Sequence, residues 1–284
     1  MNRDALPTGT LYRLSAFTRD PAGGNPAGVW IGSALPDAAG MQRIAADVGY
    51  SETAFIAPAS GPARTVRYYS PLAEVTFCGH ATIASGVVLG RRDGAGDYLL
   101  DTLAGPVNVR VTADGGDFTA TLTSVDTRQR PADAVLEPAL AALGWSRDEL
   151  DDAIPPVIAY AGAWHLVLAV TSRERLEQLD YDFDALKALM EANDLTTLQL
   201  VWRESDAVLH SRNPFPVGGV VEDPATGASA AALGGYLRDA GLVTAPFEMT
   251  IRQGEDMGRP SLLAVSVPAE GGIDVTGTAV DILV

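Results

Sequence analysis

Four short polar segments hold most of the residues in this chain that could do chemistry. They are Gly24–Gly28 (GNPAG), Ser51–Phe55 (SETAF), Phe77–Thr82 (FCGHAT) and Glu222–Ser229 (EDPATGAS). The last two lead into apolar stretches through a glycine. Because the first backbone N–H groups of a helix have no partner within the helix, two such helix starts facing one another would bind a carboxylate. The segments therefore predict an anion site at which acid–base groups could act.

Taken one at a time, the reactive side chains of these segments also allow ordinary structural roles. Glu52 could project into the anion site, although an arbitrary glutamate is more often a solvated loop residue. Asp223 precedes a proline, as turn and cap residues do. His80 could donate to a carbonyl group in the core, and Cys78 could be a small buried hydrophobic residue. No single one of them identifies an activity.

The rest of the chain offers few other chemistries. It has three histidines and one cysteine, without an HExxH pair or a cysteine cluster, so we expect no metal site. GxxxxGK[ST] is absent, and no GxGxxG stands between a strand and a helix, which argues against a nucleotide site. Gly227–Ala231 departs from the GxSxG pattern of a serine nucleophile at its last position.

Composition indicates a globular protein and excludes several partners. Of the 284 residues, 47% are hydrophobic and 20% are charged. The net charge of -16, with Lys187 the only lysine, would repel phosphate groups, so we expect neither nucleic acid nor a membrane surface as partner. Met1–Thr10 lacks the apolar core of a secretory signal, and a single cysteine forbids an internal disulfide. We expect a cytoplasmic protein.

The elements that must position the polar segments mix strands and helices. After a strand from Leu11 and a loop over Asp20–Gly28, the pattern predicts strands at Val29–Ile31, Ala54–Ala57, Thr65–Tyr69, Trp164–Val170 and Asp274–Val284. It predicts helices at Asp37–Val48, Leu136–Leu143 and Phe183–Ala192. The longest apolar run, Ile154–Val170, is interrupted by proline and glycine and is interpreted as buried strands rather than a membrane span.

Two further stretches, Ala81–Leu89 and Ser229–Leu237, consist of small residues without charge. A helix without a polar face must be buried. Aligning Gly79 with Gly227 gives a weak internal repeat, as two related domains each wrapped around one helix would produce. Chance similarity between alanine-rich helices explains the repeat equally well. The polar run Ser124–Pro131 is the predicted junction between the two domains.

Together the segments resemble the phenazine-biosynthesis-like (PhzF-type) family almost from end to end. AFTRDPAGGNPAGV, SETAF, FCGHATIASGVVL, VVEDPATGASAAAL and RQGEDMGRPS occur in the order and spacing of that family. The resemblance implies an α+β, diaminopimelate-epimerase-like fold of two pseudo-symmetric domains, each a curled mixed β-sheet around a central helix. It places the active site in a cleft between the domains. The expected domains are residues 1–125, completed by the C-terminal strand 276–284, and residues 126–275.

The same resemblance implies a cofactor-independent isomerase or epimerase, a homodimer, acting on a small carboxylate-bearing metabolite. In the phenazine enzyme of the family, a glutamate takes a proton from one carbon of a dihydro-hydroxyanthranilate and returns it elsewhere. A carboxylate whose pKa is raised toward neutrality by partial burial can be both base and acid. The catalytic residues carried over are Glu52, His80 and Asp223. The substrate-binding residues are Asn25, Gly79, Thr226, Gly227 and Ala228.

Departures from the family pattern leave the substrate open. The common TGSA reads TGAS here, so Ala228 replaces a serine that can contact substrate, and Arg212–Pro216 (RNPFP) moves an aromatic ring by one position. Related racemases use two opposed cysteines, where this chain has Cys78 and Thr226. A threonine hydroxyl cannot replace a thiolate as acid and base, which disfavours two-thiol racemisation.

Two alternatives remain from the sequence. A non-catalytic small-molecule binding protein could keep the same cleft, although retention of all three acid–base residues argues against it. A lyase or hydratase could use the same base to eliminate water, and the sequence does not separate it from an isomerase.

Overall fold

The computed structural model describes residues 8–58 and 63–283. Most of the segment Met1–Thr10 and the last residue of the predicted final strand, Val284, lie outside the described residues. The chain forms two compact units. The first comprises the residues up to Leu122 together with those from Thr276 onward, and the second comprises Thr123–Val275.

The described residues of the first unit form a curled sheet with two helices. Its strands are β1 (Gly9–Ala16), β2 (Asn25–Gly32), β3 (Glu52–Pro58), β4 (Arg64–Tyr69), β5 (Glu74–Val75), β6 (Gly96–Thr102), β7 (Gly105–Asp114), β8 (Asp117–Thr123) and β17 (Asp274–Asp281). Its helices are α1 (Ala38–Val48) and α2 (Gly79–Asp93). Strands β2 and β3 are parallel, as are β4 and β6, while β1–β2, β3–β4, β6–β7 and β7–β8 are antiparallel.

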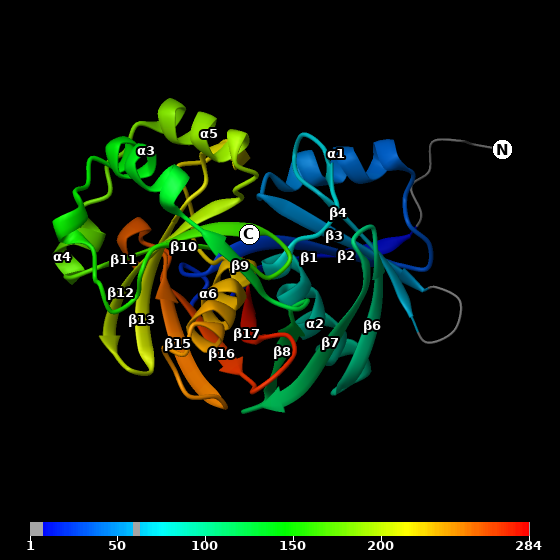
Figure 1. Cartoon of the computed structure of the whole chain (residues 1–284). Coiled ribbons are helices and arrows are strands. Elements are labelled where there is room, and N and C mark those ends of the chain that lie inside the picture. Colours follow the sequence, from blue (N-terminus) through cyan, green and yellow to red (C-terminus); the bar gives the residue numbers. More distant parts are fainter. Residues whose placement is uncertain (1–7, 59–62, 284) are drawn as a thin grey trace. The chain divides into compact units, whose positions relative to one another are not determined.

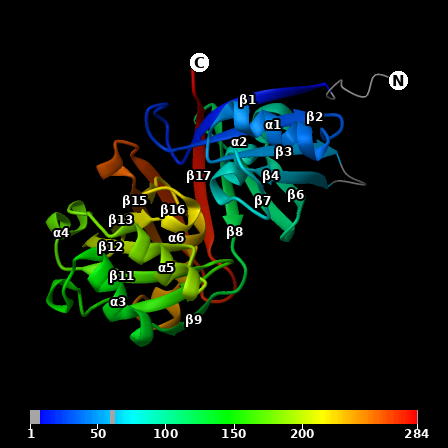
Figure 2. The same ribbon diagram turned by 90° about the horizontal axis from the view of Figure 1, so that it is seen from above.

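The C-terminal strand closes this sheet on itself. β17 runs antiparallel to β1, with Leu14 opposite Asp281, and also pairs with β8. Figure 2 shows β17 crossing beside both strands. Thr121 and Thr276 add a side-chain hydrogen bond of 2.7 Å between β8 and β17. The ring of strands around α2 is complete only with residues from both ends of the chain.

Helix α2 fills the inside of the ring and packs against β1, β2, β3 and β7 (Figure 1). Its residues from His80 to Gly90 are all buried. Small side chains are required because the strands come close. A Cβ added at Gly86 would lie 2.6 Å from the Cβ of Ala120, and one added at Gly90 would lie 2.6 Å from the ring of Phe118. The absence of a polar face, noted from the sequence, follows from this enclosure.

The second unit has the same plan with more helices. Its strands are β9 (Arg128–Pro131), β10 (Val157–Tyr160), β11 (Trp164–Val170), β12 (Thr197–Ser205), β13 (Val208–Pro214), β14 (Glu222–Asp223), β15 (Phe247–Gln253) and β16 (Ser261–Val267). Its helices are α3 (Asp133–Leu143), α4 (Arg173–Glu177), α5 (Phe183–Ala192) and α6 (Gly227–Asp239), with 3-10 turns at Arg147–Glu149, Pro216–Gly218 and Glu255–Met257. Helix α6 packs against β9, β10, β11, β12 and β16.

The pairings of the two units correspond strand by strand. The antiparallel pair β1–β2 corresponds to β10–β11, the parallel pair β2–β3 to β11–β12, and β4–β6 to β13–β15. The short strands β5 and β14 each pair with the strand before them and lead into the central helix. Because α2 begins at Gly79 and α6 at Gly227, the alignment proposed from the sequence holds. The predicted α+β class with two pseudo-symmetric, curled domains is confirmed.

The structure corrects one local prediction: the segment Asn25–Gly28, predicted as part of a loop, begins β2, because its backbone pairs with β1 from Ala16 onward. The polar run Ser124–Pro131 begins just after the division between the two units, and its second half forms a strand, β9, which pairs with β10. The arginines of β9 gain aromatic partners: the guanidinium of Arg128 lies 4.2 Å from the ring centroid of Tyr160. Stacking of this kind lets charged residues form a strand that composition alone assigns to a linker.

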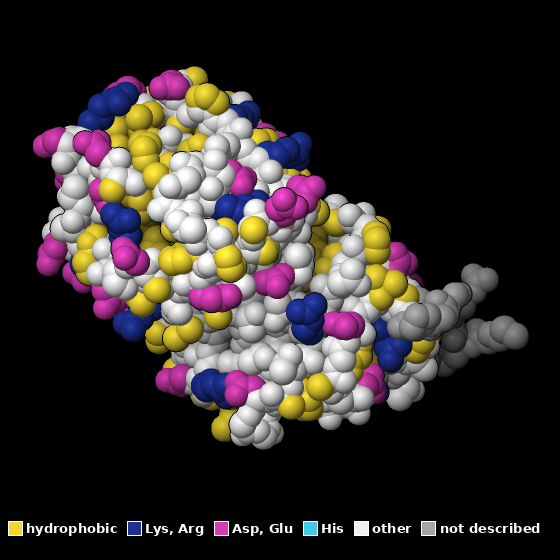
Figure 3. All heavy atoms as spheres, turned by 60° about the horizontal axis from the view of Figure 1, so that its bottom comes forward, with side chains coloured by type: hydrophobic (Ala, Val, Ile, Leu, Met, Phe, Trp, Pro, Cys, Tyr) yellow, Lys and Arg dark blue, Asp and Glu magenta, His cyan; other side chains and the backbone are white. Residues whose placement is uncertain are grey.

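On the face shown in Figure 3, positively charged side chains are interspersed with aspartates and glutamates. Among the described residues, no helix combines the length and the apolar character needed to cross a membrane.

His165 on β11 is a core residue of the second unit. Its side chain is fully buried, and Nδ1 lies 2.8 Å from the hydroxyl of Thr197, while Nε2 has no hydrogen-bond partner in the described structure. Removal from water lowers the pKa of His165 to about 3, because the charged form cannot be hydrated. The imidazole is therefore neutral in the folded chain at physiological pH.

The corresponding glycines Gly86 and Gly234 should respond differently to alanine. Each change favours the helix by about 1 kcal/mol. At Gly86 the new methyl group would lie 2.6 Å from the Cβ of Ala120, whereas at Gly234 the nearest atoms are side-chain methyl groups at 3.1 Å. We expect Gly86→Ala to lower the unfolding free energy by about 1–3 kcal/mol and Gly234→Ala to change it by less. Urea unfolding followed by circular dichroism measures both, and equal midpoints would contradict the packing described for α2.

His165 should make the stability of the chain depend on pH. The unfolded chain binds a proton at this residue with a pKa of about 6.5, whereas the folded chain does not until about pH 3. As the pH falls below 6.5, the unfolding free energy should decrease, with a slope approaching about 1.4 kcal/mol per pH unit. In urea titrations at several pH values, His165→Gln should lose this part of the slope. An unchanged slope would show that His165 takes up a proton in the folded state.

Candidate active site

The start of α2 brings three reactive side chains of the first unit together. Glu52 is the first residue of β3, Cys78 is the N-cap of α2, and His80 lies in the first turn of that helix. Their donor atoms all lie within 4.8 Å of one another. Cys78 and His80 are buried, and 19% of the Glu52 side chain is exposed. The carboxylate is therefore the member of the group that solvent or a ligand reaches.

One oxygen of Glu52 receives the contacts from both neighbours. Oε2 lies 3.4 Å from Nε2 of His80 and accepts a hydrogen bond from the thiol of Cys78 at 3.5 Å. The cysteine Sγ also lies 3.4 Å from Nδ1 of His80. These contacts fix the carboxylate from the helix side.

Asn25 and Ser51 complete the surroundings of the His80 ring. Nδ2 of Asn25 lies 3.2 Å from Nδ1, and the hydroxyl of Ser51 lies 3.3 Å from Nε2. With the amide nitrogen of Asn25 facing Nδ1, that ring nitrogen accepts a hydrogen bond. Nε2 then carries the ring hydrogen and points it at Glu52. Asn25 thereby sets the tautomer that supports the carboxylate.

The first glycine of GNPAG, Gly24, forms the tight turn that precedes Asn25. Gly24 has φ of 67°, and a Cβ there would lie 2.4 Å from the carbonyl oxygen of Ala16. Only glycine fits a left-handed turn this close to β1. Asn25 follows as a buried residue at the start of β2, beside the parallel strand that begins with Glu52.

Neither central helix is capped by the side chain of its own N-cap residue. Cys78 before α2 and Thr226 before α6 both lack a capping hydrogen bond. No atom lies within 4 Å of the place where a Cβ of Gly79 would stand. The first-turn N–H groups of α2 are therefore not capped by the Cys78 side chain, and a helix start of this kind favours an anion.

In the second unit, the start of α6 is held by Gln253 of β15. Its side-chain nitrogen donates to the carbonyl of Asp223 at 2.8 Å and to the hydroxyl of Thr226 at 3.0 Å, and its oxygen accepts from the backbone N–H of Thr226 at 3.1 Å. The Thr226 hydroxyl donates to Oδ2 of Asp223 at 2.5 Å. Gly254, at φ of 75°, lies close to the segment before α6: a Cβ there would lie 2.8 Å from the carbonyl oxygen of Pro224.

Buried polar contacts stabilise the segment before α6. Arg212 on β13 forms a buried ion pair of 2.6 Å with Glu222 on β14. Asn213 is fully buried and donates to Ser229 of α6 at 2.9 Å and to Gln199 of β12 at 2.7 Å. Removing one partner of such a buried pair would leave the other charge uncompensated. The position of Asp223 thus depends on the whole strand pair β13–β14.

The acid–base groups have no counterparts in the second unit. Thr197 begins β12 as Glu52 begins β3, and Thr226 and Ala228 take the places of Cys78 and His80 at the helix start. Thr197 is buried and hydrogen-bonded to His165. The reactive side chains are concentrated in the first unit.

The predicted site residues therefore fall into two groups. Asn25, Glu52, Gly79 and His80 meet in the first unit, and Asp223, Thr226, Gly227 and Ala228 meet at the start of α6 in the second. The convergence of both helix starts on one carboxylate stays a prediction. Sequence reasoning missed Ser51 and Gln253, although both lie within the segments that resemble the family. It interpreted Cys78 as a small buried hydrophobic residue rather than as a donor to Glu52.

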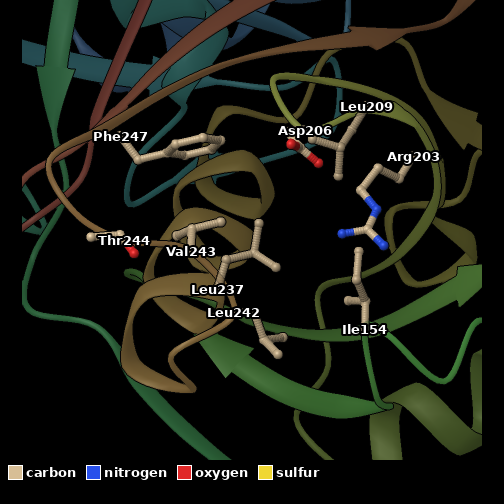
Figure 4. A pocket seen from close by; sticks show the side chains of 9 residues that line it. All are labelled: Ile154, Arg203, Asp206, Leu209, Leu237, Leu242, Val243, Thr244 and Phe247. Atoms are coloured by element: carbon tan, nitrogen blue, oxygen red, sulfur yellow. The ribbon is translucent and has the colours of Figure 1, made fainter.

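Two other features of the described structure lie outside these groups. His210 is held between carboxylates, with Nδ1 2.6 Å from Glu255 and Nε2 2.8 Å from Glu204. A pocket of about 370 Å³ in the second unit is lined by Ile154, Arg203, Asp206, Leu209, Leu237, Leu242, Val243, Thr244 and Phe247 (Figure 4). None of the predicted site residues lines it.

Comparisons with known proteins identify the family of the chain. The family model of phenazine biosynthesis-like proteins matches residues 14–283. An uncharacterized isomerase of Bacillus subtilis, YfhB, is 30% identical, and the match covers 95% of each chain. Trans-2,3-dihydro-3-hydroxyanthranilate isomerase of Pseudomonas chlororaphis is 30% identical over 92% of this chain and 90% of its own.

Solved structures share the fold. The PhzF-family phenazine biosynthesis protein of Bacillus anthracis superposes with a TM-score of 0.85 at 22% identity, covering 96% of each chain. A probable proline racemase of Agrobacterium radiobacter has a TM-score of 0.67 at 14% identity, covering 96% of this chain and 91% of its own. The curled two-domain architecture therefore extends beyond the chains that share recognisable sequence.

Proposed function

Because this chain belongs to the phenazine biosynthesis-like family, whose curated relatives are named isomerases, we propose that it moves a proton on a small carboxylate-bearing metabolite without a cofactor. Glu52 is the proposed base. The observation that carries the proposal is the arrangement of His80 and Cys78 around one oxygen of that carboxylate. Family membership is also the ground for proposing a cytoplasmic homodimer.

The contacts of Glu52 suit a group that takes up and returns a proton. His80 and Cys78 both contact Oε2, so Oε1 is the oxygen proposed to face the substrate. Two donors on Oε2 stabilise the anion before proton transfer. When Oε1 takes the proton, the buried donors keep the carboxyl group in place, so that the same oxygen can deliver the proton to another carbon.

The second unit has no acid–base group at the positions equivalent to Glu52, Cys78 and His80, which supports proton transfer by Glu52 alone. The places of Glu52, Cys78 and His80 are occupied in the second unit by Thr197, Thr226 and Ala228. Hydroxyl and methyl groups do not exchange protons with carbon at neutral pH. The proton that leaves the substrate is therefore proposed to be the one that returns, except when it exchanges with water at Glu52.

The open helix starts are proposed to bind the carboxylate of the substrate. The first-turn N–H groups of α2 beside Gly79, and those of α6 at Gly227 and Ala228, would each favour an anion by about 0.3–1 kcal/mol. Their backbone dipoles act at short range, whereas the surface acids behind the net charge of -16 are screened by salt. Asp223 is proposed to accept a hydrogen bond from a polar group of the substrate.

Glu52→Gln should abolish turnover while the chain stays folded, because the amide keeps the shape of the side chain but cannot carry the proton. We expect kcat to fall by at least about 100-fold. Trans-2,3-dihydro-3-hydroxyanthranilate and a panel of small amino and hydroxy acids would be followed by proton NMR in deuterium oxide. Deuterium should enter the substrate only with the unchanged carboxylate.

Cys78→Ala provides the matched comparison, since it removes one donor to Oε2 but leaves the base. Its loss of activity should be much smaller than that of Glu52→Gln. If Glu52→Gln retains more than about a hundredth of the activity, the base is another residue. Release of water from the substrate without label exchange would identify a lyase.

Asp223→Asn should lower kcat/KM by roughly 10- to 100-fold, the range expected when a hydrogen bond to a charged group is lost. Thr226→Val removes only the hydroxyl that holds Oδ2 of Asp223, so a smaller loss is expected. Steady-state kinetics on the substrate found above measures both variants. Activity of Asp223→Asn within twofold of the original chain would exclude Asp223 from the site.

A further inference from the structure

The side chains around the proposed base also have the composition of a transition-metal site. Within the described residues, Glu52, Cys78 and His80 are a group of three ligand-type side chains with donor atoms close enough for one ion. They supply one sulfur, one nitrogen and one oxygen. We propose that these residues bind one Zn²⁺ ion and that bound zinc inhibits the chain by occupying Glu52.

The distances between the three donors fit a tetrahedral ion. Sγ of Cys78 lies 3.8 Å from Nε2 of His80 and 3.5 Å from Oε2 of Glu52, and Nε2 lies 3.4 Å from Oε2. With zinc–sulfur bonds of about 2.3 Å and zinc–nitrogen or zinc–oxygen bonds of about 2.0–2.2 Å, tetrahedral angles require donor separations of about 3.3–3.6 Å. The three separations lie within a few tenths of an ångström of this range. Because Sγ also lies 3.4 Å from Nδ1, the imidazole must turn so that the Nε2 lone pair faces the ion.

The donor set selects zinc over the common hard cations. Thiolate and imidazole are ligands of Zn²⁺ and other borderline-soft metals, whereas Mg²⁺ and Ca²⁺ prefer sites made of oxygen. A thiolate and a carboxylate together balance the two positive charges of the ion. Three protein ligands leave the fourth tetrahedral position for water or another small ligand.

Asn25 is suited to support the metal-bound form of His80. When Nε2 binds the ion, the ring hydrogen must lie on Nδ1, 3.2 Å from the Asn25 amide. Rotation of that amide presents its oxygen, which can accept the hydrogen. A ligating histidine whose other nitrogen donates to a carbonyl group is the usual arrangement in zinc sites.

Zinc binding has a defined proton balance. The S–H bond of Cys78 breaks and the zinc–sulfur bond forms, while the proton passes to water or buffer. Affinity should therefore increase as the pH rises. The 19% exposure of the Glu52 side chain provides the route of entry.

The inhibition rests on the proposed function, whereas the binding does not. Zinc on Oε2 would withdraw electron density from the carboxylate and displace the donors that support it. A base in that state cannot take a proton from carbon. The two parts are tested by separate measurements.

Binding is tested with metal-free protein, with zinc chloride in calorimetry and with cobalt chloride as a coloured probe. We expect one ion per chain and a thiolate-to-cobalt charge-transfer band. Because Cys78 is the only cysteine, alkylation by iodoacetamide reports on this residue alone, and zinc should slow it. Calorimetry in buffers of different ionisation enthalpy should show proton release.

Variants locate the ion. Cys78→Ala should abolish the charge-transfer band and the tight zinc site, and Asn25→Leu should weaken binding by about 10- to 100-fold. His210→Gln is the matched control, because it removes a histidine that lies between two carboxylates elsewhere in the chain. Zinc binding that survives Cys78→Ala, or that His210→Gln abolishes, would overturn the proposal.

Activity measurements separate the two claims. Zinc at one equivalent should inhibit proton exchange, and a chelator should restore it. Tight binding without inhibition would overturn the inhibitory role. If no substrate is turned over, the proposed function fails, while the cobalt spectrum and the alkylation rates still decide whether the metal site exists.

Discussion

In each unit, a sheet encloses one helix, and this enclosure determines which side chains the helix can carry and where a reactive site can form. Helix α2 is buried from His80 to Gly90, and α6 from Ser229 to Leu237, so neither can carry charge along its length. The strands tolerate only small side chains where they cross, as at Gly86 beside Ala120. Charged side chains are confined to the ends of each helix, where the backbone itself needs partners. A reactive site at a helix start follows from that confinement.

How far the sequence predicts this structure depends on how local the signal is. The strand Trp164–Val170 and the helix Phe183–Ala192 have the predicted bounds, since apolar runs and caps are read from neighbouring residues. The strand β9 was missed because its stability comes from β10 and from rings that stack on its arginines. Glu52, Cys78 and His80 could be named, but their distances could not, because the register of β2 and β3 and the start of α2 set them together.

The two units show how a repeated fold can divide its tasks. In the first, Tyr68 of β4 reaches the hydroxyl of Thr82 inside α2 at 2.6 Å; in the second, Asn213 of β13 reaches Ser229 inside α6. Both contacts join the central helix to the strand that precedes the short strand β5 or β14. The framework is thus kept while the chemistry differs: an acid–base group at one helix start and an amide-held aspartate at the other.

The pairing of β17 with β1 and β8 also sets an order for biosynthesis. A ribosome releases the residues of β1 through β8 long before it makes β17, so the first ring of strands stays open, with a bare edge along β1, until β17 has been made. All strands of the second unit, β9 to β16, precede β17 in the chain and have been made by then. In the cell, the unpaired strand edges of the first unit are therefore exposed to chaperones and to mispairing for the longest time, because this unit is started first and completed last.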